Sequence, residues 1–198
     1  MQSRLFILIS LISLISITGL YAYAVTLDVT SVGEIEDDSD KLLDGVLGTA
    51  IYTVGSSTYV VAASEDEHGI EIIDISDPTS PTSVGRLADG TDTDVCTVAN
   101  EEKCLEESVD VAIWYDTNDN DKPYAVVAGS RDNGIEIIDI SDPTSPTSVG
   151  SLADASGCAT DDIDKTCLAH VSTVAATTIG SSTYVVAAGH GVDDGIEI

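Results

Sequence analysis

The sequence predicts an all-β fold made of β-propeller blades, and three observations lead to this prediction. The segment GIEIIDISDPTSPTSVG occurs twice without change, at 69–85 and 134–150, and GIEI begins a third time at Gly195. The spacing between these landmarks is 65 and then 61 residues. Each period contains short runs rich in Val, Ile, Thr and Tyr between turn-forming residues, which is typical of β-strands. Repeats of this length with four short strands are typical of propeller blades.

Each repeat begins with a predicted strand rich in Ala, Val and Thr. These first strands are Val46–Val54, Val109–Tyr115 and Val171–Ile179. A second strand, centred on a tyrosine, follows a Gly-Ser-Ser turn in the first and third repeats and a longer acidic turn in the second. In a propeller, the first strands would be the inner ones, which line the central channel.

The third predicted strand of each repeat is apolar on both faces. Ile70 and Ile72 point to one face, whereas Ile73 and Ile75 point to the other, so the strand needs neighbours above and below it. The Asp-Pro-Thr-Ser-Pro stretch ends this strand because proline cannot donate to the ladder, and a short outer strand around Ser-Val-Gly closes the unit. Tandem β-sandwich modules are the alternative, but such modules usually need more residues and more strands.

The N-terminus has the pattern of a secretory signal peptide. A charged start precedes an apolar run at Leu5–Leu20, and Ala22-Tyr23-Ala24 is a small-x-small cleavage site. An uncleaved anchor is the alternative, because this stretch is close to the length that spans a bilayer. We expect residues 1–24 to be removed and Val25–Ile198 to form the mature chain.

The predicted domain organisation follows from these boundaries. An outer strand is expected at 25–34, and the repeats are expected at approximately 45–87, 108–152 and 170–198, the last one truncated. Propellers usually have about four to eight blades, so the sequence is interpreted as an N-terminal piece of a longer protein. Uncovered strand edges of such a piece would favour self-association.

The composition is strongly acidic and excludes some partners. The chain has 35 acidic and 7 basic residues, with a formal net charge of −28. Nucleic acid is not an expected partner because phosphate binding needs a basic surface. No segment after the N-terminal one is apolar and long enough to cross a membrane. Such acidity favours solubility, cation binding or a saline habitat.

The four cysteines predict two local disulfides in an exported protein. Cys96 and Cys104 follow one Leu-Ala-Asp tripeptide, and Cys158 and Cys167 follow the other. This equivalent placement favours the pairings 96–104 and 158–167, each closing one loop. A zinc site that includes nearby His170 is the alternative, but no CxxC spacing supports it.

The acidic turn of the second repeat is a candidate calcium site. Asp116, Asn118 and Asn120 stand at positions 1, 3 and 5 of a calcium-loop pattern, where alternate oxygen ligands converge on the ion. Asp121 at position 6 and Val127 at position 12 exclude a complete EF-hand. The possible metal ligands are therefore Asp116, Asn118, Asn120 and Asp121, and the alternative is a solvated polar turn.

The loops before each GIEI are also acidic, at Glu65–His68, Arg131–Asn133 and Val192–Asp194. They occupy the same end of every blade and would form a negatively charged rim that could bind cations or a basic partner. The alternative is an ordinary solvated loop end.

Catalysis has little support in the sequence. His68, His170 and His190 fall in different phases of the repeat, and neither a G-x-S-x-G nor an H-E-x-x-H motif occurs. Apart from Asp110, the predicted inner strands are almost wholly small or apolar. His170, just before an inner strand, is the one candidate for a base at the channel mouth.

The segments Gly69–Pro81 and Gly134–Pro146, each preceded by a tyrosine-containing strand, carry a family resemblance. A Gly-hydrophobic-x-hydrophobic-hydrophobic-Asp-hydrophobic-Ser-Asp-Pro strand resembles the signature of LVIVD-repeat proteins, which are secreted bacterial and archaeal β-propellers. The resemblance implies a propeller fold and a surface location. It implies no shared catalytic residues.

The function predicted from the sequence is that of a secreted or cell-surface, non-catalytic binding or adhesion scaffold, with calcium as a possible stabilising ion. Its partner would be a protein or a glycan. One alternative is an extracellular hydrolase or lyase whose catalytic residues lie in further blades. Another is a structural component of the cell envelope. Fold alone does not choose among these functions.

Overall fold

A computed structural model describes residues 30–89, 103–153, 168–190 and 195–198 of the chain. Within these ranges the chain forms eleven β-strands and no helix, which confirms the all-β prediction. All the strands lie in the unit Ser31–Ile198. Nothing in the described ranges is a helix with the length and apolarity to cross a membrane.

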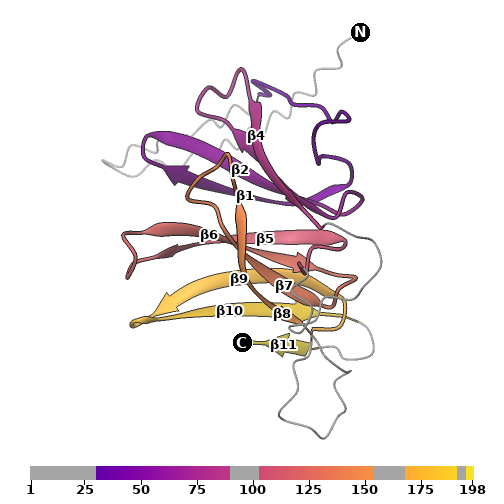
Figure 1. Cartoon of the computed structure of the whole chain (residues 1–198), viewed down its shortest axis with the longest axis vertical. Helices are drawn as coiled ribbons and strands as arrows, with labels where there is room; N and C mark the ends of the chain where they lie inside the picture. Colours follow the sequence, from indigo (N-terminus) through magenta and orange to yellow (C-terminus); the bar gives the residue numbers. More distant parts are fainter. Residues whose placement is uncertain (1–29, 90–102, 154–167, 191–194) are drawn as a thin grey trace, which may run out of the picture. The chain divides into compact units, whose positions relative to one another are not determined.

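The strands form three antiparallel sheets, here called blades 1, 2 and 3, in which neighbours in sequence are also neighbours in the sheet (Figure 1). Blade 1 contains β1 (Val46–Val54), β2 (Ser57–Ser64), β3 (Gly69–Asp74) and β4 (Thr82–Ala88). Blade 2 contains β5 (Ser108–Asp116), β6 (Lys122–Gly129), β7 (Gly134–Asp139) and β8 (Thr147–Ala153). Blade 3 contains β9 (Val171–Ile179), β10 (Ser182–Gly189) and β11 (Gly195–Glu197). Four strands per repeat are thus confirmed in blades 1 and 2.

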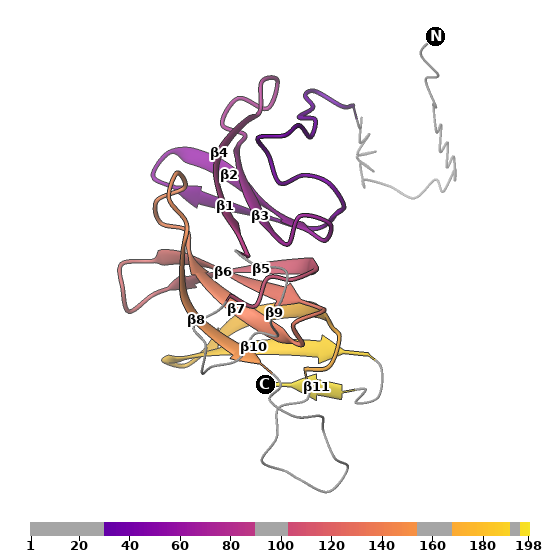
Figure 2. The same cartoon turned by 45° about the vertical axis from the view of Figure 1, so that its right-hand side comes forward.

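The first strands of successive blades lie side by side, as inner propeller strands do (Figures 1 and 2). Two contacts tie these strands together. The Tyr115 hydroxyl of β5 accepts the N–H of Thr53 in β1 (3.0 Å). The Asp110 carboxylate of β5 accepts the Thr173 hydroxyl (2.8 Å) and the N–H of Val174 (3.0 Å) in β9. Asp110, the polar exception among the predicted inner strands, therefore links blade 2 to blade 3.

The third strand is buried on both faces, as predicted. Ile70 and Ile72 on one face are 0% exposed, and Ile73 on the other is 6% exposed. Ile70 and Ile72 belong to a core cluster that also contains Leu105 and Ile138 of the next repeat. The hydrophobic core therefore lies between the blades, where burial of apolar surface stabilises their stacking.

The predicted outer strand at 25–34 differs from the observed structure. Residues 25–29 lie outside the described part, and residues 30–34 are not in a strand. In the complete blades the equivalent segments, β4 and β8, pair with the third strand of their own repeat. The described chain before Gly33 offers no such partner strand, so the sequence pattern alone does not produce a strand there.

Candidate functional site

The polar residues of the repeated seventeen-residue segment stabilise its own turns. The Asp74 carboxylate accepts the N–H of Ser76 (2.8 Å), and the Asp77 carboxylate accepts the N–H of Thr79 (3.0 Å). Blade 2 repeats both bonds with Asp139 and Asp142 as acceptors. Hydrogen bonds from the Ser76 and Thr79 side chains and backbone hold the pKa values of Asp74 and Asp77 below their ordinary value. Both aspartates are thus turn-forming residues.

A buried glutamate in the third strand has the same environment in blades 1 and 2. Glu71 is 0% exposed and Glu136 is 1% exposed. The hydroxyl of Ser83 in β4 donates to Glu71, and that of Ser148 in β8 donates to Glu136. Each carboxylate also accepts a backbone N–H, from Leu42 (3.0 Å) and from Cys104 (2.9 Å), respectively.

These contacts make the glutamates structural. Burial raises the pKa of Glu136 above its ordinary value, and the hydrogen bonds from Ser148 and the N–H of Cys104 partly offset that increase. A buried carboxylate is tolerated only when its oxygens have donors, and each glutamate has a side-chain and a backbone donor. The glutamates therefore fasten the third strand to the outer strand and to the segment that enters the blade.

The acidic loops before GIEI also bind these entering segments, which are Leu42–Gly45 before β1 and Cys104–Glu107 before β5. The Glu67 carboxylate accepts the N–H of Asp44 (3.2 Å), and the buried Asp132 carboxylate accepts the N–H of Glu106 (2.8 Å). Part of the predicted acidic rim therefore has an internal role that the sequence analysis missed. The third acidic loop, Val192–Asp194, falls outside the described residues.

In blades 1 and 2, the residue just before the third strand bridges to the next blade. Nδ1 of His68 accepts the N–H of Glu107 (3.1 Å), and the Asn133 side-chain oxygen accepts the N–H of His170 (2.8 Å). All four residues have positive φ values, between 45° and 53°. Asn tolerates this left-handed conformation better than most residues. His68 thus supports the blade stack.

His170, the predicted base at the channel mouth, is exposed and stacks on His190. Their ring centroids are 5.7 Å apart and their planes differ by 8°. Within the part of the chain that the structure describes, no three His, Cys, Asp or Glu side chains are grouped so that they could hold a metal ion. The general-base role of His170 stays a prediction.

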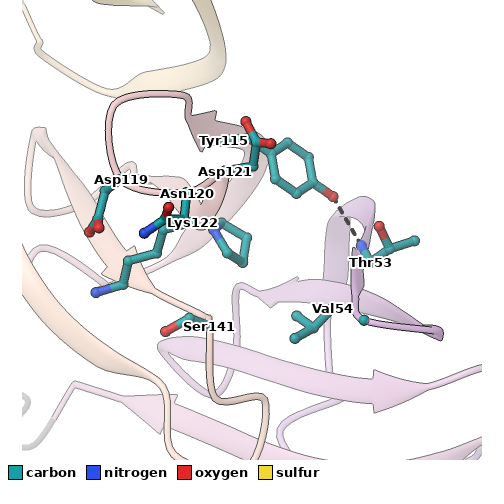
Figure 3. A pocket seen from close by; sticks show the side chains of 10 residues that line it. Thr53, Val54, Tyr115, Asp119, Asn120, Asp121, Lys122 and Ser141 are labelled. Atoms are coloured by element: carbon teal, nitrogen blue, oxygen red, sulfur yellow. Dashed lines mark hydrogen bonds between the residues drawn. The ribbon is translucent and has the colours of Figure 1, made fainter.

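A pocket of about 500 Å³ lies between the β1–β2 turn of blade 1 and the β5–β6 turn of blade 2 (Figure 3). Its lining consists of Thr53, Val54, Gly55, Tyr115, Asp119, Asn120, Asp121, Lys122, Pro123 and Ser141. The pocket thus combines a tyrosine ring, amide and hydroxyl groups, and charges of both signs. Small-molecule sites typically have this concave form with a few placed polar groups.

Two interactions fix the walls of the pocket. Tyr115 is held against blade 1 by the hydrogen bond from the N–H of Thr53, drawn as a dashed line in Figure 3. Nζ of Lys122 lies 2.7 Å from the Asp139 carboxylate, which raises the pKa of Lys122. Asn120 and Asp121 have positive φ values of 53° and 56°, and both are exposed in the β5–β6 turn.

A family model described as LVIVD repeat matches residues 58–89 and 123–154. The chain contains two LVIVD repeats. The resemblance seen in the sequence is confirmed, and each LVIVD match spans the second to fourth strands of one complete blade. A search of curated proteins found no match.

The LVIVD matches contain the structural contacts that blades 1 and 2 share, but not most of the pocket lining. The buried glutamates and the aspartate turns lie inside the matched residues, which explains why both repeats use them identically. Thr53–Gly55 and Asp119–Lys122, which form most of the pocket lining, precede the matches. The pocket is therefore built mainly from segments outside the LVIVD matches.

The structure describes all four predicted calcium ligands, which lie on or beside the β5–β6 turn. The Asp116 carboxylate accepts the N–H (2.9 Å) and the side-chain amide (3.2 Å) of Asn118, which makes these two residues part of a local turn. Asn120 and Asp121 line the pocket. Calcium binding here stays a prediction.

Of the four cysteines in the predicted disulfides, the structure describes Cys104. Cys104 is 0% exposed and is not a free thiol. Cys96, Cys158 and Cys167 lie outside the described residues, so the pairings 96–104 and 158–167 stay predictions.

Proposed function

We propose that this protein is an exported, non-catalytic binding scaffold and that the pocket between blades 1 and 2 is its ligand site. The observation that carries the proposal is the pocket of about 500 Å³, whose walls are fixed by inter-blade and ion-pair contacts. The repeated carboxylates, by contrast, bind backbone and hydroxyl groups of the fold itself.

The lining favours a neutral, polyhydroxylated ligand such as a glycan. Asp119 and Asp121 can accept hydroxyl protons, and the Asn120 amide can both donate and accept. The Tyr115 ring supplies an apolar surface beside these polar groups. A net charge of −28 disfavours an anionic glycan at physiological ionic strength.

A glycan array tests this proposal directly. The test variant is the double substitution Asn120→Gly and Asp121→Gly, because glycine removes both side chains while tolerating the positive φ of these positions. The control variant is Ser181→Gly, in the equivalent turn of blade 3. We expect the double variant to lose glycan binding and the control to keep it. Absence of binding by the wild type, or equal binding by both variants, would contradict the proposal.

The export part of the proposal rests on the signal-peptide pattern in residues 1–24. Terminal sequencing of the native protein tests it. We expect the mature chain outside the cell to begin at Val25, and an intracellular protein that retains residues 1–24 would overturn this part alone.

A further inference from the structure

Two histidines of the third repeat lie side by side at one end of its strands. His170 comes just before β9 and His190 just after β10, whereas the pocket lies at the opposite strand ends, which the β1–β2 and β5–β6 turns join. Both side chains are exposed, and their ring centroids are 5.7 Å apart. The inference below is therefore independent of the proposed function.

The backbone of the repeat brings these two positions together. The N–H of His190 donates to the carbonyl oxygen of His170 (3.3 Å), which has a positive φ of 45°. The same backbone bond joins Glu65 to Gly45 in the first repeat and Ser130 to Glu107 in the second. The fold therefore fixes the proximity of the two positions, but it does not require a histidine at either of them.

The backbone of His170 is anchored, whereas the two imidazoles are available to a ligand. The N–H of His170 donates to the Asn133 side-chain oxygen (2.8 Å). Within the described ranges, the imidazoles of His170 and His190 contact each other, and neither ring takes part in a hydrogen bond or an ion pair. His68 differs from them, because its Nδ1 accepts the N–H of Glu107.

A pair of imidazoles at this distance can bind one transition-metal ion. Such an ion lies about 2.0–2.1 Å from each imidazole nitrogen, so the two nitrogens must come within about 4 Å of each other. Nitrogens at the edges of rings whose centroids are 5.7 Å apart can reach that separation. The ring planes differ by 8°, so the rings must turn before both nitrogens point to one ion, and exposed side chains turn readily.

We propose that His170 and His190 form a two-histidine site for a divalent transition-metal ion, with water completing the coordination. Imidazole suits zinc, copper and nickel ions, and copper(II) should bind most tightly because it stands highest in the Irving–Williams order. The net charge of −28 raises the concentration of cations near the protein. Two protein ligands leave positions open to water, so the ion is exchangeable, unlike a structural zinc ion with four protein ligands.

The test titrates the complete chain with copper(II) chloride and with nickel(II) chloride in a calorimeter. Excess calcium chloride is present throughout, because this hard cation occupies carboxylate sites and leaves imidazoles available. We expect saturable copper binding and weaker nickel binding. Electron paramagnetic resonance of the copper complex should show coupling to the nitrogens of two imidazoles.

Two variants remove one imidazole each, and a third is the matched control. His170→Asn keeps a residue that tolerates a positive φ, and His190→Ser copies Ser130 of the second repeat. The control, His68→Asn, removes the third histidine of the chain and copies Asn133, which makes the equivalent bridge.

We expect each of the first two variants to weaken copper binding at least about tenfold and to remove one nitrogen coupling. Their denaturation midpoints without metal should match that of the wild type, because both histidines are exposed. The control should bind copper as the wild type does. Equal binding by the wild type and the two variants would overturn the proposal, because carboxylates would then hold the ion. Absence of copper binding by the wild type, or an equal loss in His68→Asn, would overturn it as well.

Discussion

The segments 69–85 and 134–150 have identical sequences, yet their surroundings differ. Both form a third strand, two aspartate turns and the beginning of an outer strand, and both hold a buried glutamate against a serine. Val84 of the first copy packs at the core between blades 1 and 2, whereas Val149 of the second is 55% exposed. The local sequence thus specifies the strand–turn unit, and the following repeat determines how deeply that unit is buried.

The different surroundings of two identical segments make it possible to distinguish stability that arises within a repeat from stability that arises between neighbouring repeats. In repeat architectures, stability is approximately a sum of terms within each repeat and terms at each interface between neighbours. The hydrogen bonds of the strand–turn unit belong to the first term and are nearly the same in both copies. Substitutions at equivalent positions of different blades should therefore reveal the interface term by itself.

The largest difference is expected for Ile70→Ala compared with Ile196→Ala. Ile70 is 0% exposed, so its truncation leaves a cavity between blades and should cost about 2–5 kcal/mol. Ile196 is 67% exposed at the equivalent position of blade 3, so its loss should cost about 0.5 kcal/mol or less. Urea denaturation of both variants measures these values, and equal losses would show that the interfaces do not differ.

A smaller difference is expected for Gly85→Ala compared with Gly150→Ala. The methyl group on Gly85 would meet the backbone at Pro143, and the required shift should cost about 1–3 kcal/mol. The methyl group on Gly150 meets no atom of the described residues within 4 Å. The denaturation midpoints of the two variants give the comparison, and a loss at Gly150 as large as that at Gly85 would indicate a contact that this account lacks.

Substitutions at Glu136 measure how much the hydrogen bonds within a repeat contribute to stability. Glu136→Ala leaves the N–H of Cys104 and the Ser148 hydroxyl without their acceptor and should cost about 1–3 kcal/mol. Glu136→Gln keeps an acceptor for the N–H and an amide for Ser148, so its cost should be lower. The order of the two denaturation midpoints checks this explanation, and a reversed order would refute it.

A comparison of Glu136→Gln with the wild type should also show that the contribution of Glu136 to stability depends on pH. Burial raises the pKa of Glu136 above its ordinary value of 4.5. At pH values between 4.5 and the raised pKa, the glutamate therefore binds more protons in the folded state than in the unfolded state. Stability contributed by this group is therefore present below pH 4.5 and decreases as the pH rises through this window. The stability of Glu136→Gln relative to the wild type should increase over the same window. A constant difference from pH 4 to pH 7 would contradict the raised pKa.

The smallest effect is expected at the turn that distinguishes blade 2 from the others. Calcium binding at the β5–β6 turn would raise the melting temperature of the wild type slightly and that of Asp116→Ala less, because an ion that binds only the folded state stabilises it. Thermal denaturation with calcium and with magnesium checks this expectation. Equal responses of the two proteins would remove Asp116 from consideration.

The sequence predicted the strand framework closely because apolar periodicity and proline breaks are local signals. The predicted first strands Val46–Val54 and Val171–Ile179 are β1 and β9 as observed. The prediction that the third strand is buried on both faces also holds for Ile70, Ile72 and Ile73. The LVIVD matches fall on the same segments.

The roles of several polar residues were missed because they depend on contacts between distant segments. Glu71 reaches Leu42, which is 29 residues away, and Glu136 reaches Cys104, which is 32 residues away. The glutamate precedes its serine partner by 12 residues in both copies, and this constant spacing could have indicated the glutamate–serine contact. The pocket was not predicted either, because it brings together turns of two blades.

Hydrogen exchange on the native protein tests the central comparison most directly. The identical sequences at 69–85 and 134–150 give closely matched intrinsic exchange rates, so a difference in protection reports the surroundings. Mass spectrometry can separate the copies when the peptides extend to Arg86 and Ser151, which differ. We expect slower exchange in β4 than in β8, because the following blade covers β4 more completely. Equal protection of the two strands would contradict it.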